Sequence, residues 1–193
     1  MTCYYDDPDL IRDIVDFLLR FYIEVYSPVL EKLEVDVFTL WEDMCYNTGP
    51  LISPEMFREF VLPAYKKLTA HLKDMGVKHI LVDTDGNCWK LIPLFLEGGV
   101  TAIYPFEAAA HMDVVKVREQ YPGLQMIGGI DKRAVINGRE AIDSELEGKV
   151  PAMFKSGGYI PYIDHHVPPD ISLDNFIYYR SRLNSMIKER FTS

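Results

Sequence analysis

Carboxylate and imidazole side chains follow each of five short apolar segments in this sequence. Such side chains can transfer protons near neutral pH or bind divalent metal ions. In chain order, the candidates are Glu42, Asp43, Asp83, Asp85, Glu107, Asp131 and His165. Charged groups gathered in a semi-enclosed place are costly unless they are paired or bind a ligand. A fold that brings the ends of these segments together would therefore make them a candidate active site.

The spacing of Asp83 and Asp85 is itself informative. Residues i and i+2 on an extended backbone point the same way, so these two carboxylates would share one face. Together with His165 they offer oxygen and nitrogen ligands that suit zinc, or a harder ion such as manganese or iron. We predict a divalent metal site, zinc first, formed by Asp83, Asp85 and His165, with Glu42 or water as the fourth ligand. Without these neighbours, His165 and His166 would be read as a surface pair.

Five apolar segments that alternate with helical segments must position these residues. Strands are predicted over residues 35–41, 79–82, 100–104, 124–127 and 158–163. Helices are predicted over residues 7–33, 53–68, 88–96, 112–121, 141–155 and 173–190. Pro28 should kink or interrupt the first of these helices. Solid apolar strands that alternate with helices are typical of a parallel sheet buried on both faces.

Two parallel folds compete for this pattern. An open doubly wound sheet would usually carry a glycine-rich turn after its first strand, but here that turn is Glu42-Asp43-Met44-Cys45-Tyr46. In a parallel barrel, the C-terminal strand ends converge on one mouth, where active sites form. Five βα units are too few for a closed eight-stranded barrel, which takes about 250 residues. We predict an α/β fold of TIM-barrel type, a partial barrel of five βα units with a leading helix, as a single domain over residues 1–193.

Composition excludes several classes of protein. The 193 residues carry a formal charge of −9 and show no basic stripe, which argues against binding to nucleic acid or to anionic membranes. No segment has the roughly 18 to 20 unbroken apolar residues of a membrane span, and the N-terminus lacks the basic start of a signal peptide. The three cysteines form no CxxC pair, which favours free thiols in a reducing compartment. A cytoplasmic protein is expected.

A set of short motifs, in a fixed order, resembles the uroporphyrinogen decarboxylase superfamily. The motifs are Trp41-Glu42-Asp43, GPLISPEMF over residues 49–57, LPAYKK over 62–67, Asp85-Gly86-Asn87, GGID over 128–131, and the segment from Gly158-Tyr159-Ile160 to His165 and Pro168-Pro169-Asp170. That superfamily includes the haem-pathway decarboxylase and the corrinoid-dependent and coenzyme M methyltransferases. The resemblance runs from about residue 7 to 188 and implies the C-terminal part of a (β/α)8 barrel. The family's N-terminal strands, with their arginine-rich motif, have no counterpart here.

The resemblance implies roles for individual residues. His165 matches the histidine that lines the tetrapyrrole cleft of the decarboxylases, while Asp83 and Asp85 stand where the methyltransferases have zinc ligands. Asp43 replaces a serine that contacts a substrate carboxylate, and Glu42 matches an acidic residue common to both branches. The implied catalytic residues are Glu42, Asp43, Asp85 and His165. The residues expected to contact substrate are Trp41, Asn87, Glu107, Asp131, Lys132, Arg133 and Tyr162, although Glu107 and Asp131 could equally cap the following turn.

Three functions remain open. Uroporphyrinogen carries eight carboxylates, and each close acidic neighbour would repel it by about 1 kcal/mol at high dielectric; Lys132 and Arg133 are the main basic exceptions at these strand ends. The leading hypothesis is therefore metal-assisted methyl transfer linked to a corrinoid cofactor or a corrinoid protein. The alternative is decarboxylation of a tetrapyrrole without a cofactor. The third hypothesis is an inactive partial barrel, which is either a truncated fragment or covers its open first strand in a homodimer.

Overall fold

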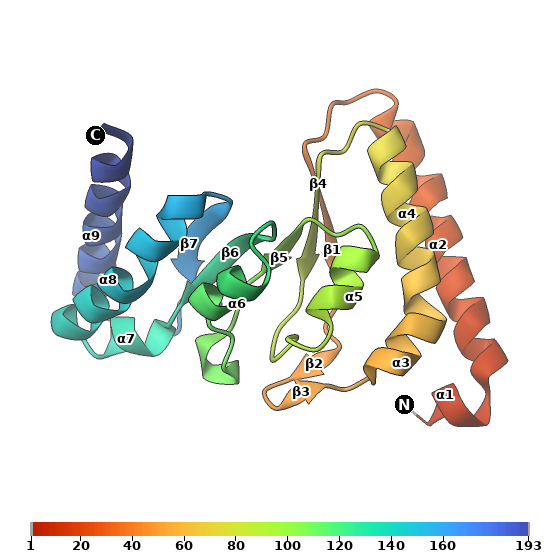
Figure 1. Ribbon diagram of the computed structural model, residues 1–193, viewed down its shortest axis with the longest axis horizontal. Coiled ribbons are helices and arrows are strands. Elements are labelled where there is room, and N and C mark those ends of the chain that lie inside the picture. Colours follow the sequence, from red (N-terminus) through yellow and green to blue (C-terminus); the bar gives the residue numbers. More distant parts are fainter. Residues whose placement is uncertain (1, 193) are drawn as a thin grey trace. The chain divides into compact units, whose positions relative to one another are not determined.

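The chain forms an α/β fold around a five-stranded parallel sheet. The computed structural model describes residues 2–192, with side-chain environments up to Arg190. The strands follow the order β1-β4-β5-β6-β7 in the sheet (Figure 1). They are β1 (Val37–Trp41), β4 (His79–Asp83), β5 (Ala102–Tyr104), β6 (Gln125–Ile130) and β7 (Tyr159–Ile163). The predicted class, with five βα units and a leading helix, is confirmed, and the sequential strand order is that of a segment of a (β/α) barrel.

The chain divides into two compact units. The first ends at Ile103 and the second begins at Tyr104, so the division falls within β5. Before the division, the backbone nitrogen of Thr101 donates to the carbonyl of Ile80 (2.9 Å). After it, the carbonyl of Pro105 accepts from the nitrogen of Gly129 (2.9 Å). The single domain expected from the sequence stays a prediction.

The first unit packs its long helices against β1 and β4. Helix α2 (Pro8–Leu30) begins after Asp7, whose side chain accepts from the nitrogen of Leu10 (3.2 Å). Helix α4 (Leu62–Asp74) lies beside α2 (Figure 1). Ser27 Oγ of α2 and His71 Nε2 of α4 form a hydrogen bond of 2.8 Å. Pro28 lies inside α2, and the helix ends at Leu30, short of the predicted end at residue 33. The shorter elements of this unit are α1 (Cys3–Asp6), α3 (Pro54–Met56), the π-helical turn Phe57–Val61 and α5 (Ile92–Glu97).

Alternation along β1 and β4 decides which side chains face those helices. Phe38 of β1 is buried and packs edge-on against Tyr26 of α2, with ring centroids 4.9 Å apart. Trp41 lies three positions further along β1 and therefore points to the opposite face. It is in parallel register with Asp83 of β4. Paired residues of parallel strands share a face, so Asp83 also points away from the helix layer.

The second unit has its own core, formed by helices that cover β6 and β7. The two strands pair in parallel from Met126 with Tyr159 to Ile130 with Ile163. The helices are α6 (Val114–Gln120), α7 (Lys132–Ile136), α8 (Arg139–Ser156) and α9 (Leu173–Thr192), together with a 3-10 turn over Ala108–Ala110. Helices α8 and α9 lie side by side (Figure 1). The buried side chains that fill this core are Ile130, Val135, Ile142, Leu146, Val150, Ile163, Ile171, Tyr179 and Leu183.

Two of the small features that were not predicted from the sequence lie next to candidate site residues. Strands β2 (Cys45–Tyr46) and β3 (Gly49–Pro50) pair antiparallel in the segment after β1. The other is α7, which begins directly after Asp131. Both are too short to produce a hydrophobic period that could be recognised in a sequence.

Membrane insertion is not supported by the helices. None of those within residues 2–192 combines the length and apolarity that crossing a bilayer requires. The cytoplasmic location expected from the sequence stays a prediction.

Candidate active site

The carboxylate of Asp43 joins the segments that follow β1 and β4. Its Oδ2 accepts from the indole Nε1 of Trp41 (2.8 Å), and its Oδ1 accepts from the backbone nitrogen of Asp85 (3.2 Å). Further along the second segment, the nitrogen of Asn87 donates to the carbonyl of Tyr46 in β2 (2.8 Å). Four residues predicted for the site therefore lie in two segments that hydrogen bonds hold together in the first unit.

Gly86 allows the segment after β4 to lie against β2. Its φ is +72°, a conformation that side chains disfavour. A Cβ atom at this position would lie 2.7 Å from the carbonyl oxygen of Tyr46. The backbone between Asp85 and Asn87 can therefore approach the hairpin only because this residue is glycine.

Glu42 points the other way, toward the helix layer. It follows Trp41, and its Oε2 accepts from the hydroxyl of Tyr65 on α4 (2.7 Å). Burial raises the pKa of Glu42, and the hydrogen bond from Tyr65 offsets only part of that effect. An apolar cavity of about 290 Å³ adjoins the carboxyl group, with walls that include Leu18 of α2 and Val61. The structure thus separates Glu42 from the face to which Asp83 belongs.

In the second unit, Glu107 and His165 offer two metal-ligand atoms close together. Glu107 follows β5 and His165 follows β7, and both side chains are partly buried. A carboxylate oxygen of Glu107 and a ring nitrogen of His165 lie within 4.8 Å of one another. The amine of Lys132 lies 3.5 Å from Glu107 Oε1 and balances its charge. His165 also contacts His166 edge-on, with ring centroids 4.7 Å apart.

The buried carboxylate of Asp164 accepts hydrogen bonds from the backbone close to Glu107 and at Lys132. Its side chain is 0% exposed. Its Oδ2 accepts from the nitrogen of Ala108 (2.8 Å), and its Oδ1 accepts from the nitrogen of Lys132 (3.1 Å). Burial raises the pKa of Asp164, although both backbone hydrogen bonds oppose that shift. Asp164 therefore fixes the backbone next to Glu107 and at Lys132.

Asp131 and Arg133 bind one another at the start of α7. Asp131 Oδ1 accepts from the nitrogen of Arg133 (2.8 Å) and caps the helix, while Arg133 Nη2 lies 2.7 Å from Asp131 Oδ2. Burial raises the pKa of Asp131, but the hydrogen bonds and charge of Arg133 outweigh it, and the net shift is downward. Tyr162, which is 40% exposed, lies near Tyr104 with ring centroids 6.3 Å apart. The substrate contacts expected of Asp131, Arg133 and Tyr162 stay predictions.

The family model described as Uroporphyrinogen decarboxylase (URO-D) matches residues 1–182. The chain belongs to the uroporphyrinogen decarboxylase family. The resemblance inferred from the motifs is thereby confirmed, and the family is one of enzymes. Comparison with curated proteins gave no match.

The thiols of this uroporphyrinogen decarboxylase family member are poorly suited to bind a metal ion. Burial raises the pKa of Cys45 to about 11, against a hydrogen bond with Thr84. Burial also raises the pKa of Cys88, whose side chain is 1% exposed. Thiolates are the form that binds metals, and burial disfavours that form at both positions. The side chain of Cys88 is buried, whereas that of Cys45 is only partly buried.

Two residues that serve the predicted site were not among the candidates. One is Tyr65, which lies in the LPAYKK motif. Because it belongs to the apolar face of α4, the sequence indicated a residue of the hydrophobic core. The other is Asp164, which directly precedes His165 in the sequence. Its position directly after β7 was the available signal, since an acid that ends a buried strand must find hydrogen-bond donors.

Proposed function

We propose that this member of the uroporphyrinogen decarboxylase family binds a divalent metal ion and uses it in methyl transfer linked to a corrinoid. The observation that supports the proposal is the pair Glu107 and His165, whose donor atoms lie within 4.8 Å in the second unit. Metal–ligand bonds of about 2.0 to 2.2 Å allow two ligands of one ion to lie at most about 4.4 Å apart. Donor atoms within 4.8 Å of one another are close to that spacing.

The chemistry of the donors fits zinc or a harder divalent ion. A carboxylate oxygen and an imidazole nitrogen suit either, whereas a soft thiolate site would need a deprotonated cysteine. Asp83 and Asp85 are the further ligands that the sequence predicts. A bound metal ion would supply Lewis-acid activation of a thiol or hydroxyl acceptor, or polarise the methyl donor.

The chain's own residues would orient this chemistry. Asp164 holds the backbone at Ala108 and Lys132, and thereby positions Glu107. Lys132 Nζ lies 3.5 Å from Glu107 Oε1, so this ion pair also holds the Glu107 side chain in place. On the first unit, Asp43 fixes the backbone at Asp85. We expect Trp41 and Tyr162, both exposed, to contact the substrate or a corrinoid protein.

Metal analysis of the purified chain tests this proposal. Mass spectrometry of metals after loading with zinc should find about one ion per chain in the wild type. His165→Ala and Glu107→Gln should each weaken zinc binding by about tenfold or more, because each removes a ligand. Asp83→Asn and Asp85→Asn test the ligands predicted from the sequence.

The matched control is His166→Ala. His166 is the exposed neighbour of His165, and its removal should leave zinc binding unchanged. Equal loss in His165→Ala and His166→Ala, or no stable metal in the wild type with zinc, manganese or iron, would contradict the proposal.

Decarboxylation of a tetrapyrrole without a cofactor is the second candidate. The description of the matching family model favours it. The surroundings of Lys132 and Arg133 count against it, because each cation already lies beside a carboxylate of its own chain, Glu107 and Asp131 respectively. Turnover of uroporphyrinogen to coproporphyrinogen by metal-free protein would favour this candidate over methyl transfer.

A further inference from the structure

A cavity of about 290 Å³ lies beside Glu42 in the first unit. Helices α2 and α4, which run side by side, form much of its wall together with the end of β1 (Figure 1). Leu40 and Leu68 belong to that wall and are buried. Ile14 and Leu18 also line the cavity and are 45% and 44% exposed, so it is open to solvent along α2. Pockets for small molecules are mostly apolar and begin at roughly 300 Å³, so this cavity suits a small ligand.

Glu42 is the charged group of this otherwise uncharged wall. None of the other described residues that line the cavity is acidic, and none is lysine, arginine or histidine. The hydroxyl of Tyr65 donates to Glu42 Oε2 at 2.7 Å, and a carboxylate can accept about four hydrogen bonds in all. Burial raises the pKa of Glu42, and the nearby charge of Asp43 raises it further. A ligand with a positive charge would supply the partner that the described wall lacks.

Three tyrosines surround the carboxyl group. Tyr4 of α1, Tyr22 of α2 and Tyr65 of α4 all line the cavity. Burial raises the pKa of both Tyr4 and Tyr65, and the charge of Glu42 raises both further, so their hydroxyl groups lie close to that carboxylate. Aromatic rings attract organic cations through the negative potential of their faces. A carboxylate among tyrosine rings is therefore an environment that favours an ammonium group.

The helix that carries Tyr65 is preceded by a π-helical turn, Phe57–Val61. Turns of this kind are rare and frequently occur at functional sites. Val61 ends the turn and lies four residues before Tyr65, a spacing that places two side chains on one side of a helix. Both residues line the cavity, so the unusual backbone belongs to its wall.

We propose that this cavity binds a small organic ammonium ion with a compact apolar or aromatic body, whose ammonium group pairs with Glu42. The apolar body would occupy the space between α2 and α4. An anionic ligand would be repelled by the carboxylate, and a neutral one would leave it desolvated without a counter-charge. The pair that supports the proposed metal site, Glu107 and His165, belongs to the second unit, so this is a different site.

Isothermal titration calorimetry of the full chain near neutral pH tests the proposal. The probes are benzylamine and benzyl alcohol, which share a ring but differ in charge. The wild type should bind benzylamine about tenfold or more tightly than benzyl alcohol, because only the amine forms a charged hydrogen bond. Glu42→Gln keeps the size of the side chain and an acceptor for Tyr65, but removes the charge. It should weaken benzylamine binding about tenfold or more and leave benzyl alcohol binding unchanged.

Matched variants separate the cavity from general effects of charge and bulk. Glu24→Gln removes a carboxylate that is exposed on α2, outside the described lining, and should leave benzylamine binding unchanged. Ala64→Phe fills the cavity without changing its charge and should weaken binding of both probes about tenfold or more. The same exchange at Ala70, an exposed position of α4 outside the described lining, should affect neither probe. Circular dichroism establishes that each variant is folded.

Three results would overturn the proposal. One is a folded wild type that binds no benzylamine, and another is equal affinity for benzylamine and benzyl alcohol, because the cavity would then bind apolar molecules irrespective of charge. The third is equal weakening of benzylamine binding by Glu42→Gln and Glu24→Gln, which would indicate general attraction of a cation to an acidic chain. Metal content is measured separately, so the proposed function can fail or stand independently of these results.

Discussion

Glu42 is a largely buried carboxyl group that accepts a hydrogen bond from Tyr65 of α4. Because burial raises its pKa above the ordinary value of about 4.5, the folded state holds the proton more tightly than the unfolded state does. The resulting stabilisation is fully present below the ordinary pKa. It is lost as the pH rises through the raised pKa of the folded state.

Glu42→Gln should therefore remove part of the pH dependence of stability. We expect the wild type to lose free energy of unfolding between about pH 4.5 and neutral pH, and we expect Glu42→Gln to lose less over that interval. The amide of glutamine can still accept the hydrogen bond from Tyr65. Urea denaturation at several pH values measures the difference.

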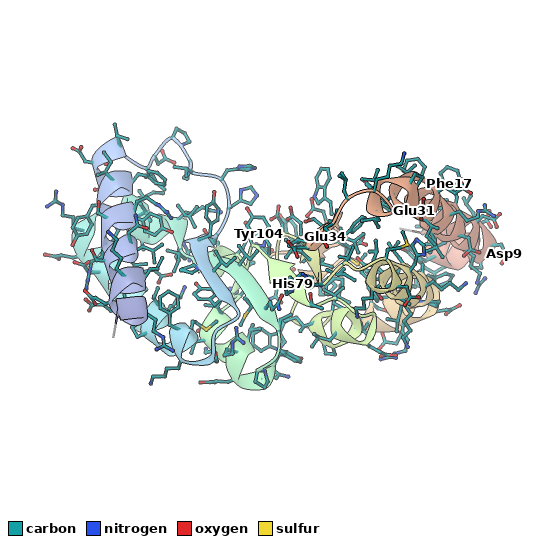
Figure 2. All side chains as sticks on the ribbon, turned by 90° about the horizontal axis from the view of Figure 1, so that it is seen from above. Asp9, Phe17, Glu31, Glu34, His79 and Tyr104 are labelled. Atoms are coloured by element: carbon teal, nitrogen blue, oxygen red, sulfur yellow. The ribbon has the colours of Figure 1, made fainter. Side chains whose placement is uncertain are left out.

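Glu31→Gln is the matched control for this prediction. Glu31 follows α2, is exposed, and is labelled in Figure 2. Its replacement should leave the pH profile as in the wild type. A parallel profile for wild type and Glu42→Gln would show that Glu42 has no shifted titration.

Sequence reasoning identified the strand-end residues, but not the side to which each one points. Asp83 and Asp85 were placed on one face by their spacing, while Glu42 was grouped with them because all three follow strands. One position of alternation puts Glu42 on the helix side, where Tyr65 binds it. That partner comes from α4, and no local pattern in the sequence connects the two residues.

At the scale of the elements, the five short apolar segments were predictable because strands of a parallel sheet are rich in apolar residues. Strands β1 and β7 nevertheless alternate between buried and exposed positions. Caps at Asp7 and Ser53 marked the starts of their helices, and the side chains of both accept a backbone hydrogen bond there. The hairpin of β2 and β3 has two residues in each strand, so it left no period to detect. The start of α7 was marked only by Asp131, a residue that was also expected to contact substrate.

Gly128 shows how closely β6 approaches the segment after β5. Its φ is +110°, and a Cβ atom there would collide with the carbonyl of Pro105. Gly128→Ala should therefore destabilise the protein by about 1 to 3 kcal/mol from backbone strain alone. Chemical denaturation measures this loss.

The same exchange at Gly148 should have the opposite effect on the stability of the protein. Gly148 lies within α8, and its added Cβ would meet nothing within 4 Å. This variant should gain about 0.5 to 1 kcal/mol, because alanine loses less backbone entropy in a helix. Equal effects of the two exchanges would contradict the conformation assigned to Gly128.

At the scale of the whole molecule, each compact unit has a hydrophobic core of its own. Leu183 is fully buried in the core of the second unit, and Phe57 is fully buried in the first. Units with cores of their own can open separately, even when the chain is continuous.

Leu183→Ala should destabilise the second unit more than the first. We expect a loss of about 2 to 5 kcal/mol, as for other buried leucines. Hydrogen exchange should quicken mainly after Ile103, whereas Phe57→Ala should produce the reverse pattern. Uniform acceleration along the chain in both variants would show that the two units unfold as one.

The hydrogen bonds around Asp43 also bear on the intrinsic tryptophan fluorescence of the protein. The sequence contains two tryptophans, Trp41 and Trp89. The indole of Trp41 is bonded to Asp43, which also binds the backbone of Asp85, and the nitrogen of Trp89 donates to the side chain of Asn87 (3.2 Å). Both fluorophores are thus attached to the segment that follows β4. Intrinsic fluorescence is accordingly a local probe of that segment, and a ligand that orders it would change the emission without any added label.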